Sequence, residues 1–157
     1  MRKDRIERVS HSTATLYIDG MLHRGRIELT VRAGDWFAQA DRDLAHAEGS
    51  LEQGSHEWAC FASHQSAEKA VKALHLHLGQ ESWGHVVAKL LRELPIEVPA
   101  ELVERGQVLD NFYVPARYPN GHPEGAPFEH YGPRQSEEAI EDARAIVEFV
   151  RTQTASP

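Results

Sequence analysis

SHEWACFASHQSAEKAVKALHLHLG, residues 55–79, is the stretch of sequence that decides the fold. Its apolar residues recur at intervals of three and four, the period of an α-helix with one buried face. These positions are Ala67, Ala70, Val71, Leu74 and Leu78. Small residues on the same stretch allow a second helix to approach closely, namely Ala59, Ala62, Ser63 and Ser66. Gly79 is a typical stop signal, so the sequence predicts a central helix over about 55–78.

Helical periodicity continues on both sides of this stretch. We predict further helices near 35–48, 85–94 and 99–113, and a last helix beginning at Ser136. Pro95 ends the third helix, and Pro99 suits the first turn of the fourth. The predicted fold class is therefore all-α, an up-and-down bundle of about five helices formed by residues 33–152.

The two ends of the chain fit this bundle poorly. TLYIDGMLHRGRIELTV, residues 15–31, alternates like a short hairpin with Asp19-Gly20 as its turn, so we expect residues 1–32 to be a hairpin or a disordered extension. This extension carries a charge of +3 against −10 for the remainder, from seven Lys/Arg and four Asp/Glu. A basic arm of this kind could contact RNA or an acidic partner, or be a frayed terminus. Residues 153–157 are expected to be a disordered tail.

The composition limits the classes of function. The chain has 157 residues, 41% hydrophobic and 26% charged, which suits one soluble domain. It lacks an apolar run near the ~20 residues needed to cross a bilayer and a signal peptide, so we expect a cytoplasmic protein that does not enter membranes. The net charge of −7 makes any contact with nucleic acid local. A single cysteine and no helical histidine pair at i, i+4 favour no metal and no cofactor.

The longest segment without helical periodicity is NFYVPARYPNGHPEGAPFEHY, residues 111–131. Loops of this length are usually functional or disordered, and this one is too aromatic to be a solvated linker. We therefore expect an ordered loop docked on the helices. Arg117 and His122 are separated in it by four residues, which puts a permanent cation beside a group that titrates near neutral pH.

Three segments together resemble the HEPN domain family (higher eukaryotes and prokaryotes nucleotide-binding). They are WFAQADRDLAHAE, then FASHQSAEKAVKALHLHLG followed by a helix-starting His85, and LDNFYVPARYPNG before a last helix rich in Ala and Glu. The resemblance covers about residues 35–152. It implies a small helical bundle, often a homodimer, and frequent pairing with a small nucleotidyltransferase in a toxin-antitoxin arrangement.

The resemblance also implies a site. In many members an arginine and a histidine at this spacing form a metal-independent endoribonuclease, so Arg117 and His122 are the predicted catalytic pair. The histidine would act on the ribose 2′-hydroxyl or the leaving oxygen, while the arginine would hold the phosphate. The expected products are a 2′,3′-cyclic phosphate and a 5′-hydroxyl. The predicted contacts to RNA, nucleotide or phosphate are Asn120, Tyr118, Lys69, Lys72 and Gln65.

Two alternatives stay open. Tyr118 and Glu124 stand where active members of the family tend to carry a small polar residue and a tyrosine. The chain could instead be a non-catalytic, nucleotide-binding HEPN subunit that docks a nucleotidyltransferase partner. It could also be a helical partner protein without a nucleotide role, in which Arg117 pairs with a helix carboxylate or carbonyl and Tyr118 fills the bundle.

Overall fold

The computed structural model describes residues 11–155, and for residues 11–19, 26 and 29 it describes the backbone only. Five α-helices and two short 3-10 helices follow one another along this part of the chain. They are α1 (His11–Glu52), α2 (His56–His77), α3 (Val87–Arg92), α4 (Ala100–Asp110), η1 (Pro119–Gly121), η2 (Pro127–Glu129) and α5 (Pro133–Ala155). Residues 11–155 contain no strand, which confirms the predicted all-α bundle of five helices.

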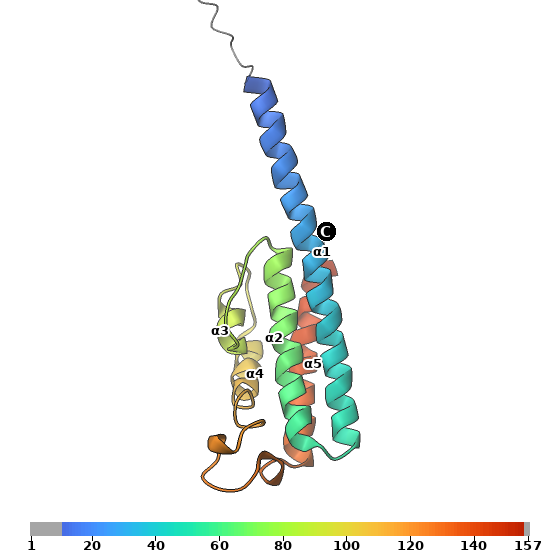
Figure 1. The fold of residues 1–157 in the computed structure, drawn as a ribbon, viewed down its shortest axis with the longest axis vertical. Helices are drawn as coiled ribbons and strands as arrows, with labels where there is room; N and C mark the ends of the chain where they lie inside the picture. The colour runs from blue at the N-terminus through green and yellow to red at the C-terminus, as the bar shows by residue number, and fades with distance from the viewer. Residues whose placement is uncertain (1–10, 156–157) are drawn as a thin grey trace, which may run out of the picture.

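The long helices α1, α2 and α5 lie side by side, and the short helices α3 and α4 lie on the other side of α2 (Figure 1). Helix α2 contacts each of the other four α-helices. More than half of its residues are buried, and these include both apolar and polar side chains. The prediction that residues 55–78 form the central helix is therefore confirmed.

The core is filled by large aliphatic side chains from α2, α3, α4 and α5. The largest of them without solvent exposure are Leu74, Leu90, Leu91, Leu109 and Ile146. Burial of each such side chain stabilises the fold by roughly 1.5–3 kcal/mol. The small residues of α2 serve close packing as expected, because Ser66 Oγ donates a 2.8 Å hydrogen bond to the carbonyl of Ala40 on α1.

The predictions for the two ends were wrong wherever the structure describes them. Instead of a hairpin at Asp19-Gly20, α1 begins at His11, runs through both residues and projects beyond the other helices (Figure 1). Gly20 and Gly25 each cost a helix about 1 kcal/mol relative to alanine, which weakens the helix without ending it, and the stretch contains no proline. Helix α5 likewise continues to Ala155. Residues 1–10 and 156–157 lie outside the described part of the chain.

The loop between α4 and α5 is docked on the bundle, as predicted. Its first turn is closed by backbone hydrogen bonds, including one of 3.1 Å from Arg117 N to Val114 O. Phe112 and Ala116 are buried in the core cluster, and Tyr131 packs against it at the other end of the loop. These contacts fix the segment that carries Arg117 and His122.

No helix within residues 11–155 has the length and apolar character needed to cross a bilayer.

Candidate nucleic-acid interface around Arg117

Arg117 is half-buried in a cage of aromatic rings. Its guanidinium carbon lies 4.4 Å from the ring centre of Phe61, 4.5 Å from that of Tyr113 and 5.0 Å from that of Tyr118. The Nε–H donates a 2.7 Å hydrogen bond to the carbonyl of Tyr113. Cation–π contacts and this bond orient the side chain, and its two terminal nitrogens make no hydrogen bond with the residues that the structure describes.

This geometry bears on the alternative in which Arg117 pairs with a helix carboxylate or carbonyl and Tyr118 fills the bundle. Arg117 does pair with a backbone carbonyl, as that alternative expects, and it makes no ion pair with a carboxylate among residues 11–155. Tyr118, however, is 53% exposed and lies over the guanidinium rather than inside the bundle. The expectation that Tyr118 fills the bundle was therefore wrong.

His122 is held by a different set of contacts. Its Nε2 donates a 2.8 Å hydrogen bond to the carbonyl of Pro115, so Nδ1 is the nitrogen without a proton when the ring is neutral. The ring stacks on His130 at 3.9 Å with an angle of 1° between the planes, and meets the edge of Tyr131 at 5.9 Å. Gly121 allows this approach, because a Cβ at that position would lie 2.6 Å from Pro115 Cα.

The structure anchors both predicted catalytic residues on one short segment. Arg117 is bonded to the carbonyl of Tyr113, and His122 to the carbonyl of Pro115 two residues later. The two side chains have separate partners and no direct hydrogen bond to each other. Asn120 lies exposed in η1 between them. The arrangement fixes both groups near the surface, and their role in catalysis stays a prediction.

The three polar residues of α2 predicted to contact phosphate are engaged within the protein. The Gln65 amide nitrogen lies 3.3 Å from a carboxylate oxygen of Glu68. Lys69 forms an ion pair with Asp43 of α1, and Lys72 forms one of 2.8 Å with Glu68. Each ammonium is thus largely neutralised by a carboxylate. This row consists of contacts within α2 and one ion pair to α1, rather than an open basic strip.

A polar network that sequence reasoning missed joins α2 to the loop that carries Arg117. The Glu68 side chain is only 5% exposed, and its oxygens lie 3.1 and 3.3 Å from Nδ1 of His85. The His85 ring stacks on Tyr113 with 4.8 Å between the ring centres and 15° between their planes. No spacing along α2 indicates this pair, because His85 reaches Glu68 from the connection that follows the helix.

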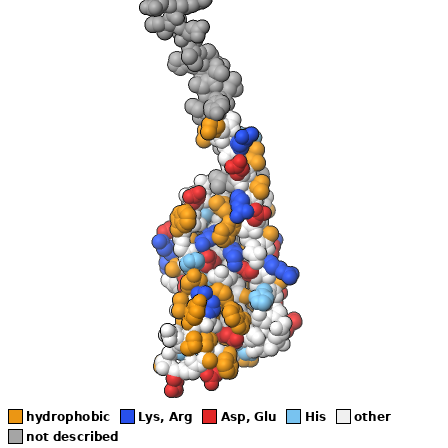
Figure 2. All heavy atoms as spheres, in the orientation of Figure 1, with side chains coloured by type: hydrophobic (Ala, Val, Ile, Leu, Met, Phe, Trp, Pro, Cys, Tyr) orange, Lys and Arg blue, Asp and Glu red, His pale blue; other side chains and the backbone are white. Residues whose placement is uncertain are grey.

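Surface charge around these helices is mixed in sign. Figure 2 shows basic, acidic and hydrophobic side chains interspersed on the face that it presents, and in its lower half hydrophobic side chains gather around a basic one. Within residues 11–155 no group of three or more His, Cys, Asp or Glu side chains is arranged to hold a metal ion. The interface therefore offers aromatic rings and single cations rather than a field of one sign.

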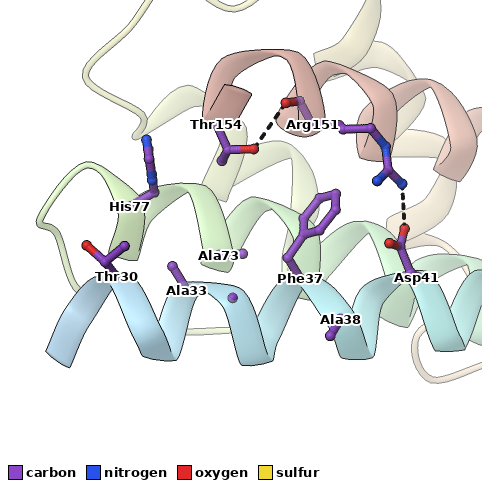
Figure 3. A pocket seen from close by; sticks show the side chains of 10 residues that line it. Thr30, Ala33, Phe37, Ala38, Asp41, Ala73, His77, Arg151 and Thr154 are labelled. Carbon is purple, nitrogen blue, oxygen red and sulfur yellow. Dashed lines mark hydrogen bonds and ion pairs between the residues drawn. The ribbon is translucent and has the colours of Figure 1, made fainter. Parts of the chain in front are cut away.

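A separate hollow of about 420 Å³ lies between α1, α2 and the end of α5 (Figure 3). Its walls include Ala33, Phe37 and Ala73, and Arg151 crosses its rim to form a 2.8 Å hydrogen bond with Asp41. None of the predicted site residues lines it. The chemistry expected from the sequence lies elsewhere, in the loop between α4 and α5.

The HEPN domain family matches residues 33–153 of the chain. The chain belongs to the HEPN family. The recognition from three sequence segments is confirmed, and the matched residues agree with the predicted bundle of residues 33–152.

Solved structures of three other proteins, two of them named as HEPN proteins, share this fold. TT1696 from Thermus thermophilus is 48% identical, with a TM-score of 0.77 over 78% of this chain and 98% of that one. ST0689, an archaeal HEPN homologue, is 41% identical, with a TM-score of 0.69 over 78% and 97%. A HEPN domain protein from Thermotoga maritima is 34% identical, with a TM-score of 0.64 over 78% and 99%.

A curated relative adds a name that concerns function. The protein named "Putative toxin MJ1304" from Methanocaldococcus jannaschii is 27% identical over 124 residues, which are 72% of this chain and 82% of that protein. The HEPN domain described here is thus related to a protein with a toxin name.

Proposed function

We propose that this HEPN domain is a metal-independent endoribonuclease of toxin type that uses Arg117 and His122. The observation that carries the proposal is the caged Arg117, whose guanidinium is oriented by three rings and one carbonyl, while its terminal nitrogens have no hydrogen-bond partner among residues 11–155. A bidentate guanidinium is the side chain best suited to a phosphodiester. The surrounding rings offer stacking surfaces for unpaired bases.

His122 supplies the proton chemistry in this proposal. Because Nε2 is hydrogen-bonded to the Pro115 carbonyl, Nδ1 is the nitrogen left for a substrate. It takes the 2′-hydroxyl proton or gives a proton to the leaving 5′-oxygen, while Arg117 stabilises the charge that develops on the phosphate. The products are a 2′,3′-cyclic phosphate and a 5′-hydroxyl. A toxin name on a relative is consistent with RNA as the target.

The test is cleavage of end-labelled single-stranded RNA by the purified chain in EDTA. We expect His122→Ala to reduce the rate by about 10²–10⁴, the usual contribution of a general acid or base. His77→Ala, which removes an exposed histidine at the end of α2, is the matched control and should cleave like the wild type. A His122→Ala variant that cleaves as fast as the control would remove His122 from the site.

The separate anchoring of Arg117 and His122 favours a second candidate function. A nucleotide-binding HEPN subunit needs the caged arginine and its rings, but needs no contact between these two side chains. Such a subunit would dock a small nucleotidyltransferase and cleave nothing. Saturable binding of nucleotide without any RNA cleavage, lost in Arg117→Lys, would support this function over the nuclease.

Assembly belongs to the proposal as well. We propose a homodimer, since two copies would place two Arg117 sites along one RNA strand. Binding at the first site would then raise the effective concentration of the strand at the second. Sedimentation equilibrium of the full chain tests this, and a mass equal to a single 17.7 kDa chain at all concentrations would contradict it.

A further inference from the structure

Glu68 and His85 form a carboxylate–imidazole pair at the edge of the Arg117 cage. The carboxylate is buried, whereas the His85 side chain is 54% exposed. Nδ1 of His85 faces both carboxylate oxygens, at 3.1 and 3.3 Å. Nε2 makes no hydrogen bond with any residue of the described part of the chain. In this arrangement a carboxylate fixes the tautomer and orientation of an imidazole whose second nitrogen stays available to a substrate.

The backbone of His85 is also fixed from inside the protein. The fully buried His64 donates a 2.9 Å hydrogen bond from Nε2 to the His85 carbonyl. The backbone just after His85 is held as well. Val87 N and Ala88 N donate hydrogen bonds of 2.6 and 3.1 Å to the carboxylate of Asp110 on α4. These bonds hold the turn before α3 against α2 and α4. His85 is therefore an exposed ring on a rigid support, which is the requirement for a residue that must meet a reacting atom.

Glu68 does not need His85 for its own charge balance. Lys72 already forms a 2.8 Å ion pair with Oε1 of Glu68, and Gln65 lies 3.3 Å from Oε2. A buried carboxylate with those partners is satisfied without an imidazole. Glu68 therefore serves to orient His85. His85 is not needed to neutralise Glu68.

His85 and Arg117 contact the same aromatic ring, that of Tyr113. The His85 ring stacks on the Tyr113 ring at 4.8 Å, and the Arg117 guanidinium carbon lies 4.5 Å from the same ring centre. The imidazole centre and that carbon are therefore within about 9 Å of each other, the sum of the two distances. His85 and Arg117 therefore border one aromatic ring, at a spacing that an RNA strand bound by its phosphate to Arg117 would have to span.

We propose that His85, oriented by Glu68, is the catalytic base that removes the ribose 2′-hydroxyl proton of RNA whose phosphate is held by Arg117. This inference rests on the proposed ribonuclease function and assigns its second proton-transfer group. Neutral His85 takes the proton at Nε2, and the 2′-oxygen forms a bond to phosphorus. The bond from phosphorus to the 5′-oxygen breaks, and protonated His122 gives that oxygen its proton. The two histidines then exchange protons with water and return to their starting states.

The experiment compares RNA cleavage by His85→Ala, Glu68→Gln and the His77→Ala control, with folding checked by thermal melting. We expect His85→Ala to lower kcat by about 10²–10⁴ with little change in KM, because a base acts only in the transition state. Free imidazole added to His85→Ala should restore part of the rate, which a merely structural histidine would not show. Glu68→Gln should lower kcat less and gain nothing from imidazole, since its His85 ring is still present.

The outcomes separate this inference from the proposed function. Cleavage by His85→Ala within about threefold of the control, while His122→Ala is inactive, would overturn the role of His85 and leave the ribonuclease intact. A folded but inactive His85→Ala that imidazole does not rescue would also overturn it. Absence of cleavage by the wild type in EDTA would overturn the ribonuclease and the base together.

Discussion

Replacing Arg117 by alanine should destabilise the fold, because this side chain is a packing element as well as a candidate ligand. The three ring contacts at 4.4–5.0 Å contribute roughly 0.5–1 kcal/mol each for a partly exposed cation. The hydrogen bond from Nε to the Tyr113 carbonyl adds about 1 kcal/mol or somewhat more. Water compensates part of both losses at this half-buried position. We therefore expect Arg117→Ala to lower the free energy of unfolding by about 2–3 kcal/mol.

Urea titration followed by far-UV circular dichroism measures this change. Protein concentration must be held constant across variants, since association would shift the apparent stability. A loss of this size corresponds to a drop in Tm of roughly 4–12 °C for a chain of this length. Arg117→Lys keeps the charge but loses the planar group and its Nε–H. We therefore expect its free energy of unfolding to lie between those of the wild type and Arg117→Ala.

Arg134→Ala is the matched control for the loss of an arginine. The Arg134 side chain is 89% exposed and is paired only with Glu138 one turn along α5 among the residues described. Such surface pairs contribute little, so we expect no measurable change in the free energy of unfolding. If Arg117→Ala were no more destabilised than Arg134→Ala, the aromatic cage would not be holding the guanidinium. The reasoning that ties Arg117 to a fixed orientation would then fail.

Two further predictions concern packing and titration. Gly121→Ala should lower the free energy of unfolding by roughly 1–3 kcal/mol in a urea titration, because its Cβ would lie 2.6 Å from Pro115 Cα. Gly132→Ala, with no atom within 4 Å of its Cβ, should change it by less than about 0.5 kcal/mol, and equal effects would contradict the close contact. Burial raises the pKa of the Cys60 thiol from 9.0 to about 12, with the Glu57 charge adding to the effect. Above pH 9 the unfolded chain loses this proton and the native state keeps it, so wild-type stability should fall by up to about 1.4 kcal/mol per pH unit relative to Cys60→Ala. Parallel stability curves for the two proteins between pH 9 and 11 would refute this.

The sequence predicted the helices best where an apolar stripe meets clear end signals. Residues 55–78 were expected as a helix and form α2 at His56–His77, and the last helix begins three residues before Ser136. The third and fourth helices are shorter than expected at Val87–Arg92 and Ala100–Asp110. The N-terminal stretch was assigned wrongly because alternation around Asp19-Gly20 over a few residues also fits a helix whose apolar side chains stay exposed. Met21, Leu22, Ile27 and Val31 are 52–63% exposed.

The site was predictable in its residue types but not in its contacts. A cation and an imidazole in one aromatic loop could be read from residues 111–131, and the structure docks that loop as expected. The ring of Phe61 over Arg117 comes from another helix, and no local spacing indicates it. The pair of Glu68 and His85 depends on how the connection after Gly79 returns to α2. Contacts of this kind depend on packing between distant segments, which periodicity along one helix does not specify.

The charge pairing on α2 determines how RNA could bind. Lys69 and Lys72 appear from the sequence to be free cations for phosphate, but Asp43 and Glu68 neutralise them. Affinity from released counterions depends on how many cations remain to contact phosphates, and the ion pairs of Lys69 and Lys72 reduce that number. The chain as a whole carries −7, so long-range attraction does not add to it. In the proposed function, recognition would therefore come mainly from bases stacking on the aromatic rings, with Arg117 holding one phosphate, and the proposal predicts tighter binding of unpaired RNA than of a duplex.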